Sequence, residues 1–202
     1  SRACLLSGQY TPRHGVYAVG STNRGPAKLM RLVPIKNNSG LRAEEFTLPK
    51  ALKSAGYVTG MFGKWHLDGS AGSKPEEHFD VVQVAGHSWK GSDEDDPKGV
   101  FSIAAAACDF IEANRSRPFF AYLPHYAIHS GLQSRKQVLA KFKQKPPGEK
   151  HRNPAAAACL AELDESVGIV LKKLVELGLE QNTLVVFTSD NGGTAESQEP
   201  LR

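Results

Sequence analysis

Residues Gly56–Leu67, GYVTGMFGKWHL, decide the fold of this chain. A helix predicted before this stretch ends at Gly56, and a short apolar strand follows it. Residues two apart in a strand point to the same face, so Lys64 and His66 are expected to project together while Trp65 packs on the other side. A fixed cation beside a titratable imidazole suits a site that holds an anion and moves protons.

Helical patterns alternate with short apolar runs along the rest of the chain. This alternation predicts an α/β fold, a layered sandwich with a mostly parallel central sheet flanked by helices. Residues 9–43, rich in Gly, Pro, Arg and Asn, are expected to form a long surface excursion. The expected helices are 48–55, 100–114 and 154–177, and the expected strands are 57–62, 118–123 and 183–188.

Two of the strands, 118–123 and 183–188, are apolar almost throughout, which predicts burial on both faces. The longest helix is expected to begin at Asn153 and to end at Gly178. Apolar residues recur along it at steps of three and four, the pattern of a stripe that faces a core. The expected stripe is Leu160, Leu163, Val167, Val170, Leu174 and Leu177.

Three of these strands end in polar residues, and ligands gather at the carboxyl ends of parallel strands. The first is followed by Lys64 and His66, the second by His125 and His129, and the third by Asp190 and Asn191. A carboxylate and an amide oxygen suit a hard cation such as Ca²⁺ or Mg²⁺. The alternative for the last pair is an ordinary Asp-Asn-Gly turn.

The chain has 202 residues, 40% of them apolar, and a net charge of +4, values ordinary for a globular domain. It contains no apolar run long enough to span a bilayer. A basic cluster at 134–152 is interpreted as a solvated helix face, with attraction for an anionic substrate as the alternative. It lacks interleaved aromatic residues, which argues against nucleic acid. The acidic run 93–96 is interpreted as a solvated loop, with a cation site as the alternative.

The three cysteines do not make a disulfide framework. Cys108 and Cys159 lie in Ala-rich helical runs and are expected to be small buried residues. Cys4 is expected to be a packing residue.

Four motifs, in order, resemble those of the sulfatase family. SRACLLSG at 1–8 is similar to the second half of C-x-P-S-R-x-x-L-x-[ST]-G, and GKWHL at 63–67 to the second motif. PFFAYL at 118–123 and DNGG at 190–193 are similar to two later ones. The resemblance implies an alkaline-phosphatase-like fold, with 1–202 as part of a single catalytic domain. It also implies that the first strand, the nucleophile and a C-terminal part are absent from this chain.

The resemblance implies catalytic roles for four residues. Arg2 matches the Arg that holds formylglycine, an oxidised Cys or Ser expected three positions before Ser1. Lys64 matches the Lys that bridges this nucleophile and the sulfate, and His66 matches a base for sulfate release. His129 matches the substrate-contacting His that helps to protonate the leaving group.

The resemblance also implies binding residues. Asp190 and Asn191 match ligands of Ca²⁺, which is preferred to Mg²⁺, and two further Asp ligands are expected upstream. Lys64 and His129 are expected to bind substrate, and Ser88 matches a Ser or His that touches sulfate. Asp68 departs from the family pattern, in which Leu-Gly commonly follows the His.

The implied function is hydrolysis of sulfate monoesters in a sulfated small molecule or sulfated carbohydrate. Nucleic acid is not expected among its partners, and the expected location of the protein is periplasmic, secreted or lysosomal. This chain alone is expected to be inactive. One alternative is a phosphate or phosphonate monoester hydrolase of the same superfamily, and another is a non-catalytic domain that binds sulfated glycans.

Overall fold

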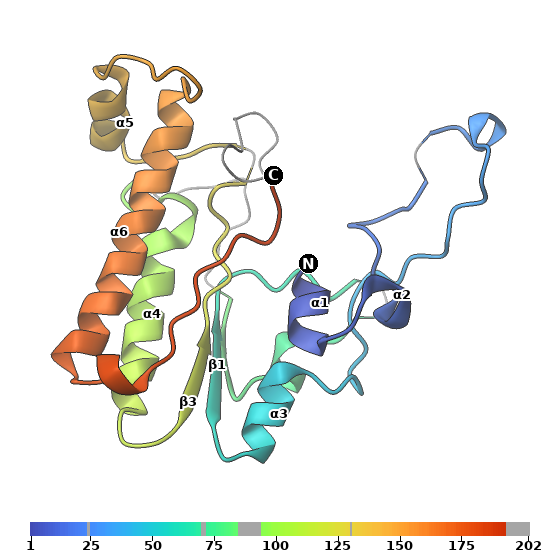
Figure 1. Cartoon of the computed structure of the whole chain (residues 1–202), viewed down its shortest axis with the longest axis horizontal. Helices are drawn as coiled ribbons and strands as arrows, with labels where there is room; N and C mark the ends of the chain where they lie inside the picture. Colours follow the sequence, from blue (N-terminus) through green and yellow to red (C-terminus); the bar gives the residue numbers. More distant parts are fainter. Residues whose placement is uncertain (24, 70–71, 85–93, 130, 193–202) are drawn as a thin grey trace.

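The computed structural model describes the chain except residues 24, 70–71, 85–93, 130 and 193–202, and its elements are arranged in layers (Figure 1). Short 3₁₀ turns occur at Ala27–Leu29, Pro75–Glu77, Pro97–Gly99 and Glu180–Asn182. The helices are α1 (Arg2–Ser7), α2 (Thr11–His14), α3 (Leu48–Ser54), α4 (Val100–Ala113), α5 (Lys136–Lys143) and α6 (Pro154–Glu176), and the strands are β1 (Val58–Phe62), β2 (Val81–Gln83) and β3 (Phe119–Tyr122).

The three strands form a parallel sheet in the order β2–β1–β3. In the register, Thr59 of β1 lies opposite Phe120 of β3, and Gly60 lies opposite Val81 of β2. The predicted α/β sandwich with a parallel sheet is therefore confirmed. β2 was not predicted, because its three residues carry no burial pattern and are joined to the sheet by backbone pairing.

Successive side chains of β1 point into two separate cores. Met61 joins the core formed with α1 and the loop after β1, whereas Phe62 joins the core formed with α4 and α6. This alternation is the period-two geometry of a strand buried on both faces. Helices therefore cover both sides of the sheet, α4 and α6 on one face and α1 and α3 on the other (Figure 1).

The long helix α6 begins where the sequence predicted. The side chain of Asn153 accepts hydrogen bonds from the backbone N–H groups of Ala155 and Ala156, which are otherwise unpaired donors of the first turn. The expected apolar stripe is wrong in part, because Leu160 is 49% exposed and, of the six residues, only Leu174 is fully buried. Small and polar residues are buried instead: Ala156, Ala158, Cys159, Glu162 and Ser166.

The expected strand 183–188 is also wrong. The segment forms no strand, and Leu184 and Phe187 are 89% and 74% exposed. An apolar run is buried only where neighbouring strands and a covering layer enclose it, and the described residues place neither around this segment. For the same reason β3, expected to be buried on both faces, is only half-buried.

Candidate active site

A pocket of about 450 Å³ gathers residues from distant parts of the chain. Four of the seven predicted site residues line it: Arg2, His66, Asp190 and Asn191. Residues 16–20 form another part of the wall, together with Ser39 and Asp68. The structure therefore brings the first, second and last motifs together.

Arg2 and Asp190 form an ion pair, with Nη2 of Arg2 3.4 Å from Oδ2 of Asp190. Arg2 is the first residue of α1. Ala3 and Leu6 of the same helix are buried in the core that also contains Met61 of β1. Asp190 follows the exposed segment 183–188. A guanidinium keeps its charge over the whole physiological pH range, so it supplies a permanent cation to this pocket.

The turn after β1 positions Lys64. Gly63 has φ +125°, and a Cβ there would lie 2.5 Å from the carbonyl oxygen of Pro124, so only glycine fits. The backbone N–H of Lys64 then donates to the same Pro124 oxygen at 2.8 Å, and its Nζ lies 6.0 Å from the ring centre of Tyr126. Burial, and next the cation of Arg2, lowers the pKa of Lys64, while Asp190 opposes the shift.

His66 leaves the strand direction, with φ +59°, a left-handed conformation that few residues other than glycine adopt. Trp65 turns away as predicted: it is buried, and its Nε1 donates to the carbonyl oxygen of Ser73 at 2.8 Å. Loss of solvent, followed by the cations of Lys64 and Arg2, lowers the pKa of His66. The imidazole is thus held toward its neutral form, which can accept a proton.

His129 does not line the pocket, but it lies close enough to His66 for its positive charge to lower the pKa of His66. Its backbone carbonyl accepts a hydrogen bond of 3.0 Å from Nζ of Lys98. Sequence reasoning missed Lys98, which is only 3% exposed and has φ +57° in the 3₁₀ turn before α4. A Lys beside a Gly at a helix start is an ordinary pattern, so no local signal marks this residue.

The other predicted residues have different outcomes. Ser88 lies outside the described residues. His125 is enclosed: burial lowers its pKa to about 4, and its Nδ1 has no hydrogen-bond partner in the described part of the chain. Asp68, the residue that differs from the family pattern, lines the pocket.

Asp190 and Asn191 line the pocket, and their side chains carry oxygen atoms, the donor type that a hard cation takes. Calcium needs six to eight oxygen ligands. Within the described residues, however, no group of three or more His, Cys, Asp or Glu side chains is arranged to hold a metal ion. The residues present therefore fit only part of a calcium shell.

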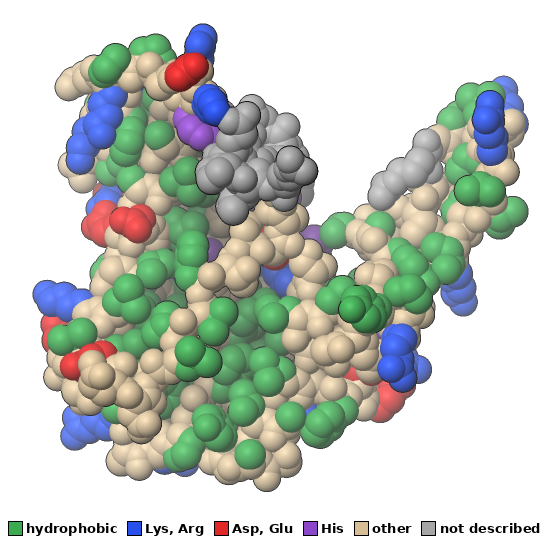
Figure 2. Space-filling view, viewed as in Figure 1, with side chains coloured by type: hydrophobic (Ala, Val, Ile, Leu, Met, Phe, Trp, Pro, Cys, Tyr) green, Lys and Arg blue, Asp and Glu red, His purple; other side chains and the backbone are tan. Residues whose placement is uncertain are grey.

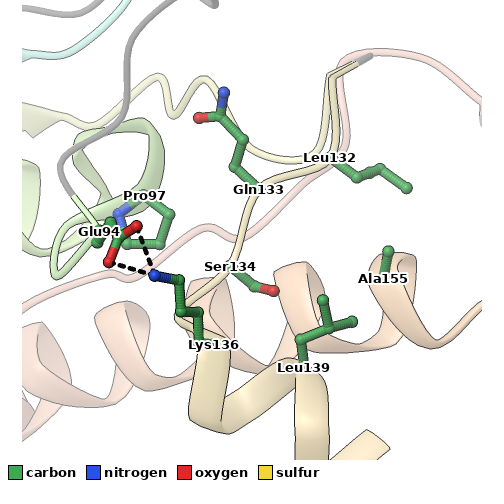
Figure 3. A pocket seen from close by; sticks show the side chains of 8 residues that line it. All are labelled: Glu94, Pro97, Leu132, Gln133, Ser134, Lys136, Leu139 and Ala155. Carbon is green, nitrogen blue, oxygen red and sulfur yellow. Dashed lines mark hydrogen bonds and ion pairs between the residues drawn. The ribbon is translucent and has the colours of Figure 1, made fainter. Parts of the chain in front are cut away.

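A second pocket, of about 200 Å³, lies between α5 and the first turn of α6 (Figure 3). Glu94 and Lys136 form an ion pair at 2.7 Å beside it. Asp96, in the same acidic run, accepts hydrogen bonds from the backbone N–H groups of Phe101 and Ser102. The described part of the acidic run is thus used in an ion pair and a helix start.

Cys4 is not a simple packing residue. It is partly exposed, and its Sγ lies 3.2 Å from Nε2 of His14 and 3.6 Å from Oγ1 of Thr11. Cys108 and Cys159 are buried, as predicted.

Comparison with known proteins defines the class first. A solved structure described as Ps i-CgsB in complex with k-i-k-neocarrahexaose shares the fold, with a TM-score of 0.66 and 21% identity over 90% of this chain and 45% of that one. The family model "Sulfatase" matches residues 1–202. The chain therefore belongs to the sulfatase family.

Two relatives carry more specific names. N-acetylgalactosamine-6-sulfatase of Rattus norvegicus is 30% identical over 95% of this chain and 40% of its own length. Arylsulfatase A of Homo sapiens is 29% identical over 95% of this chain and 42% of its own length. The chain spans less than half the length of these relatives. No helix in the described ranges is long and apolar enough to cross a membrane.

Proposed function

We propose that the protein containing this chain hydrolyses sulfate monoesters, and that this chain supplies the residues that hold the sulfate and move protons. The observation that carries the proposal is the pocket in which Arg2, His66 and Asp190 meet. These residues come from three motifs that are distant in the sequence. Such convergence suits a catalytic site, because functionally unrelated surface residues are not expected to lie together in one pocket.

The cations of Arg2 and Lys64 would bind the sulfate and offset the negative charge that grows during cleavage. Partial burial strengthens this effect, because charges interact more strongly where water is excluded. The lowered pKa of His66 suits it to accept a proton at neutral pH. His129 would donate a proton to the oxygen of the leaving alcohol.

The proposal includes two further groups, a formylglycine residue and a calcium ion. Formylglycine, expected three positions before Ser1, would supply an oxygen nucleophile, and Ca²⁺ on Asp190 and Asn191 would offset charge. The described residues provide only part of the calcium shell, and the roles proposed for Arg2, Lys64, His66 and His129 do not require the ion. The 202-residue chain alone is expected to be inactive, and the complete protein is expected to be periplasmic, secreted or lysosomal.

The test is turnover by the complete protein of matched aryl sulfate and aryl phosphonate esters. The sulfate ester should react faster, and Lys64→Ala should lower kcat/KM for it by about 10²-fold or more, the scale of a lost charge-stabilising group. Lys172→Ala is the matched control, because that side chain is 79% exposed on α6. Faster phosphonate cleavage would identify the alternative hydrolase, and binding without turnover would identify a glycan-binding domain.

A further inference from the structure

The positive charge of this protein is concentrated in its first 43 residues. That stretch contains seven Lys and Arg and neither Asp nor Glu; the first acidic residue is Glu44. The remaining residues hold 18 Lys and Arg against all 21 acidic residues, so their net charge is negative. The small overall charge of +4 therefore conceals a strongly basic segment.

Part of this segment, residues 18–23 and 25–36, forms an arm that extends away from the layered body (Figures 1 and 2). Most of its described side chains are solvent-exposed, Val33 to 94%. We call these residues the basic arm. A large surface of this kind, standing away from the core, contributes little to stability and is available for binding.

The root of the basic arm is fixed beside the candidate active site. Oδ1 of Asn37 accepts hydrogen bonds from the backbone N–H groups of Tyr17 and Ala18 at 2.7 and 3.1 Å, and its Nδ2 donates to the carbonyl oxygen of Ala18 at 2.8 Å. Residues 16–20 are also part of the pocket wall that contains Arg2 and His66. A molecule that extends from the pocket along this wall therefore meets the arm.

The charges on the arm are available to such a molecule. Lys28, Arg31 and Lys36 are exposed, and no ion pair within the described ranges involves them. Exposed apolar residues, Leu29 and Leu32 among them, lie between the cations. Residues 18–36 contain no aromatic side chain on which a nucleic-acid base could stack.

We propose that the basic arm binds anionic groups of a polymeric substrate beyond the ester in the pocket, so that the substrate class is a multiply sulfated polysaccharide. This inference rests on the proposed function and adds the size and charge of the substrate. A small monosulfate that fills the pocket would reach only the root of the arm. A polyanion that continues along the arm meets several cations and no acidic residue, an arrangement that raises local concentration and affinity.

The first test measures binding of this chain to a labelled heparin oligosaccharide, a polysulfated probe, by fluorescence anisotropy. The arm variant replaces Lys28, Arg31 and Lys36 by Gln. The control variant replaces Lys141, Lys143 and Lys145, which are exposed on and after α5, and therefore removes the same charge. The arm variant should bind about tenfold or more weakly near 0.1 M salt, and its slope of log affinity against log salt should fall by about 2. The control should change less than about twofold.

Equal losses in both variants would show attraction to net charge alone and would overturn the proposal, as would the absence of heparin binding. Competition by a DNA oligonucleotide of equal charge, as effective as heparin itself, would indicate a nucleic-acid surface instead. Thermal unfolding of each variant checks that these exposed substitutions leave the fold intact.

The second test uses the complete protein and separates this inference from the proposed function. The arm variant should hydrolyse a small aryl sulfate as the unmodified protein does, while its kcat/KM on a sulfated polysaccharide should fall by about tenfold, in step with the lost binding. Loss on both substrates would place the arm in the fold of the site and overturn the inference. If no sulfate ester reacts at all, the proposed function fails, and the heparin measurement still decides whether the arm binds polyanions.

Discussion

Nη2 of Arg2 lies 3.4 Å from Oδ2 of Asp190, so one ion pair joins the first helix to the end of the described chain. The two side chains are 17% and 47% exposed. Solvent screens a pair of this kind, which therefore contributes at most about 1 kcal/mol to stability. Its importance lies in the placement of a carboxylate and a guanidinium in the same pocket.

Replacement of Asp190 by Asn should therefore separate stability from metal binding. The free energy of unfolding should fall by about 1 kcal/mol or less. In the complete protein, calcium should raise the melting temperature, and the variant should lose most of that increase because a charged ligand is gone. Asp164→Asn, an exposed change on α6, is the control. A calcium-induced shift equal to that of the unmodified protein would remove Asp190 from the proposed metal site.

Glu162 should be the most costly single carboxylate to remove. It is buried in α6, and its Oε1 accepts hydrogen bonds from Nε and the backbone N–H of Arg135 at 2.8 and 2.9 Å. Glu162→Ala should lower the free energy of unfolding by about 3 kcal/mol, because it leaves a guanidinium without its buried partner. Glu165 also pairs with Arg135 but is 52% exposed, so Glu165→Ala should cost less than about 1 kcal/mol. Urea unfolding of both variants measures the difference, and equal costs would contradict this account.

Stability should decrease in acid because of His78. This fully buried side chain lies between Oγ1 of Thr47 at 3.0 Å and Oγ of Ser73 at 2.6 Å. Burial, followed by the cation of Lys50, lowers its pKa to about 4 from 6.5. Because the folded pKa is below the unfolded one, its contribution is complete above about pH 6.5 and is lost as the pH falls toward 4. The loss amounts to about 3 kcal/mol.

His78→Gln should flatten this dependence, as measured by urea unfolding at a series of pH values between 7.5 and 4.5. His125, whose pKa is also about 4, maintains part of the slope in the variant. His151→Gln changes an exposed His and should leave the curve unaltered. Parallel curves for His78→Gln and the unmodified chain would show that the buried network does not control acid stability.

The sequence predicted the elements whose burial follows from local pattern. The strand at Val58–Phe62 and the cap at Asn153 agree with the structure, because an apolar run and a capping side chain act over a few residues. Failures occurred where distant contacts decide. Leu160 is exposed because α6 packs on α4 through small residues, and Leu184 because no described strand pairs with its segment.

The candidate site shows the same division. The motifs identified Arg2, His66, Asp190 and Asn191, which the structure brings into one pocket. Lys98 was missed because its contact with the carbonyl of His129 depends on how α4 packs beside the strand ends. The contribution of the basic arm was also missed, since its position beside the pocket is a property of the fold.

His129→Ala in the complete protein tests the proposed proton donor. An alkoxide leaving group needs its proton more than a stabilised phenolate does, so the loss should be largest for alkyl and sugar sulfates. We expect a decrease of about 10²–10⁴-fold for these esters, the usual contribution of a general acid. Activated aryl sulfates, whose leaving group departs unaided, should be affected much less. The measurement is the dependence of kcat/KM on the pKa of the leaving group, which should become steeper in the variant.

Two comparisons make this result specific to the His129 imidazole. His151→Ala should leave the slope unchanged, since His151 lies in the exposed loop before α6. His66→Ala should instead slow the release of sulfate from the enzyme, so a sulfated enzyme species should accumulate and be visible by mass spectrometry. If His129→Ala slows activated and unactivated esters equally, the imidazole positions the sulfate and does not donate a proton. The hydrogen bond from Lys98 to the His129 carbonyl would then fix a binding residue.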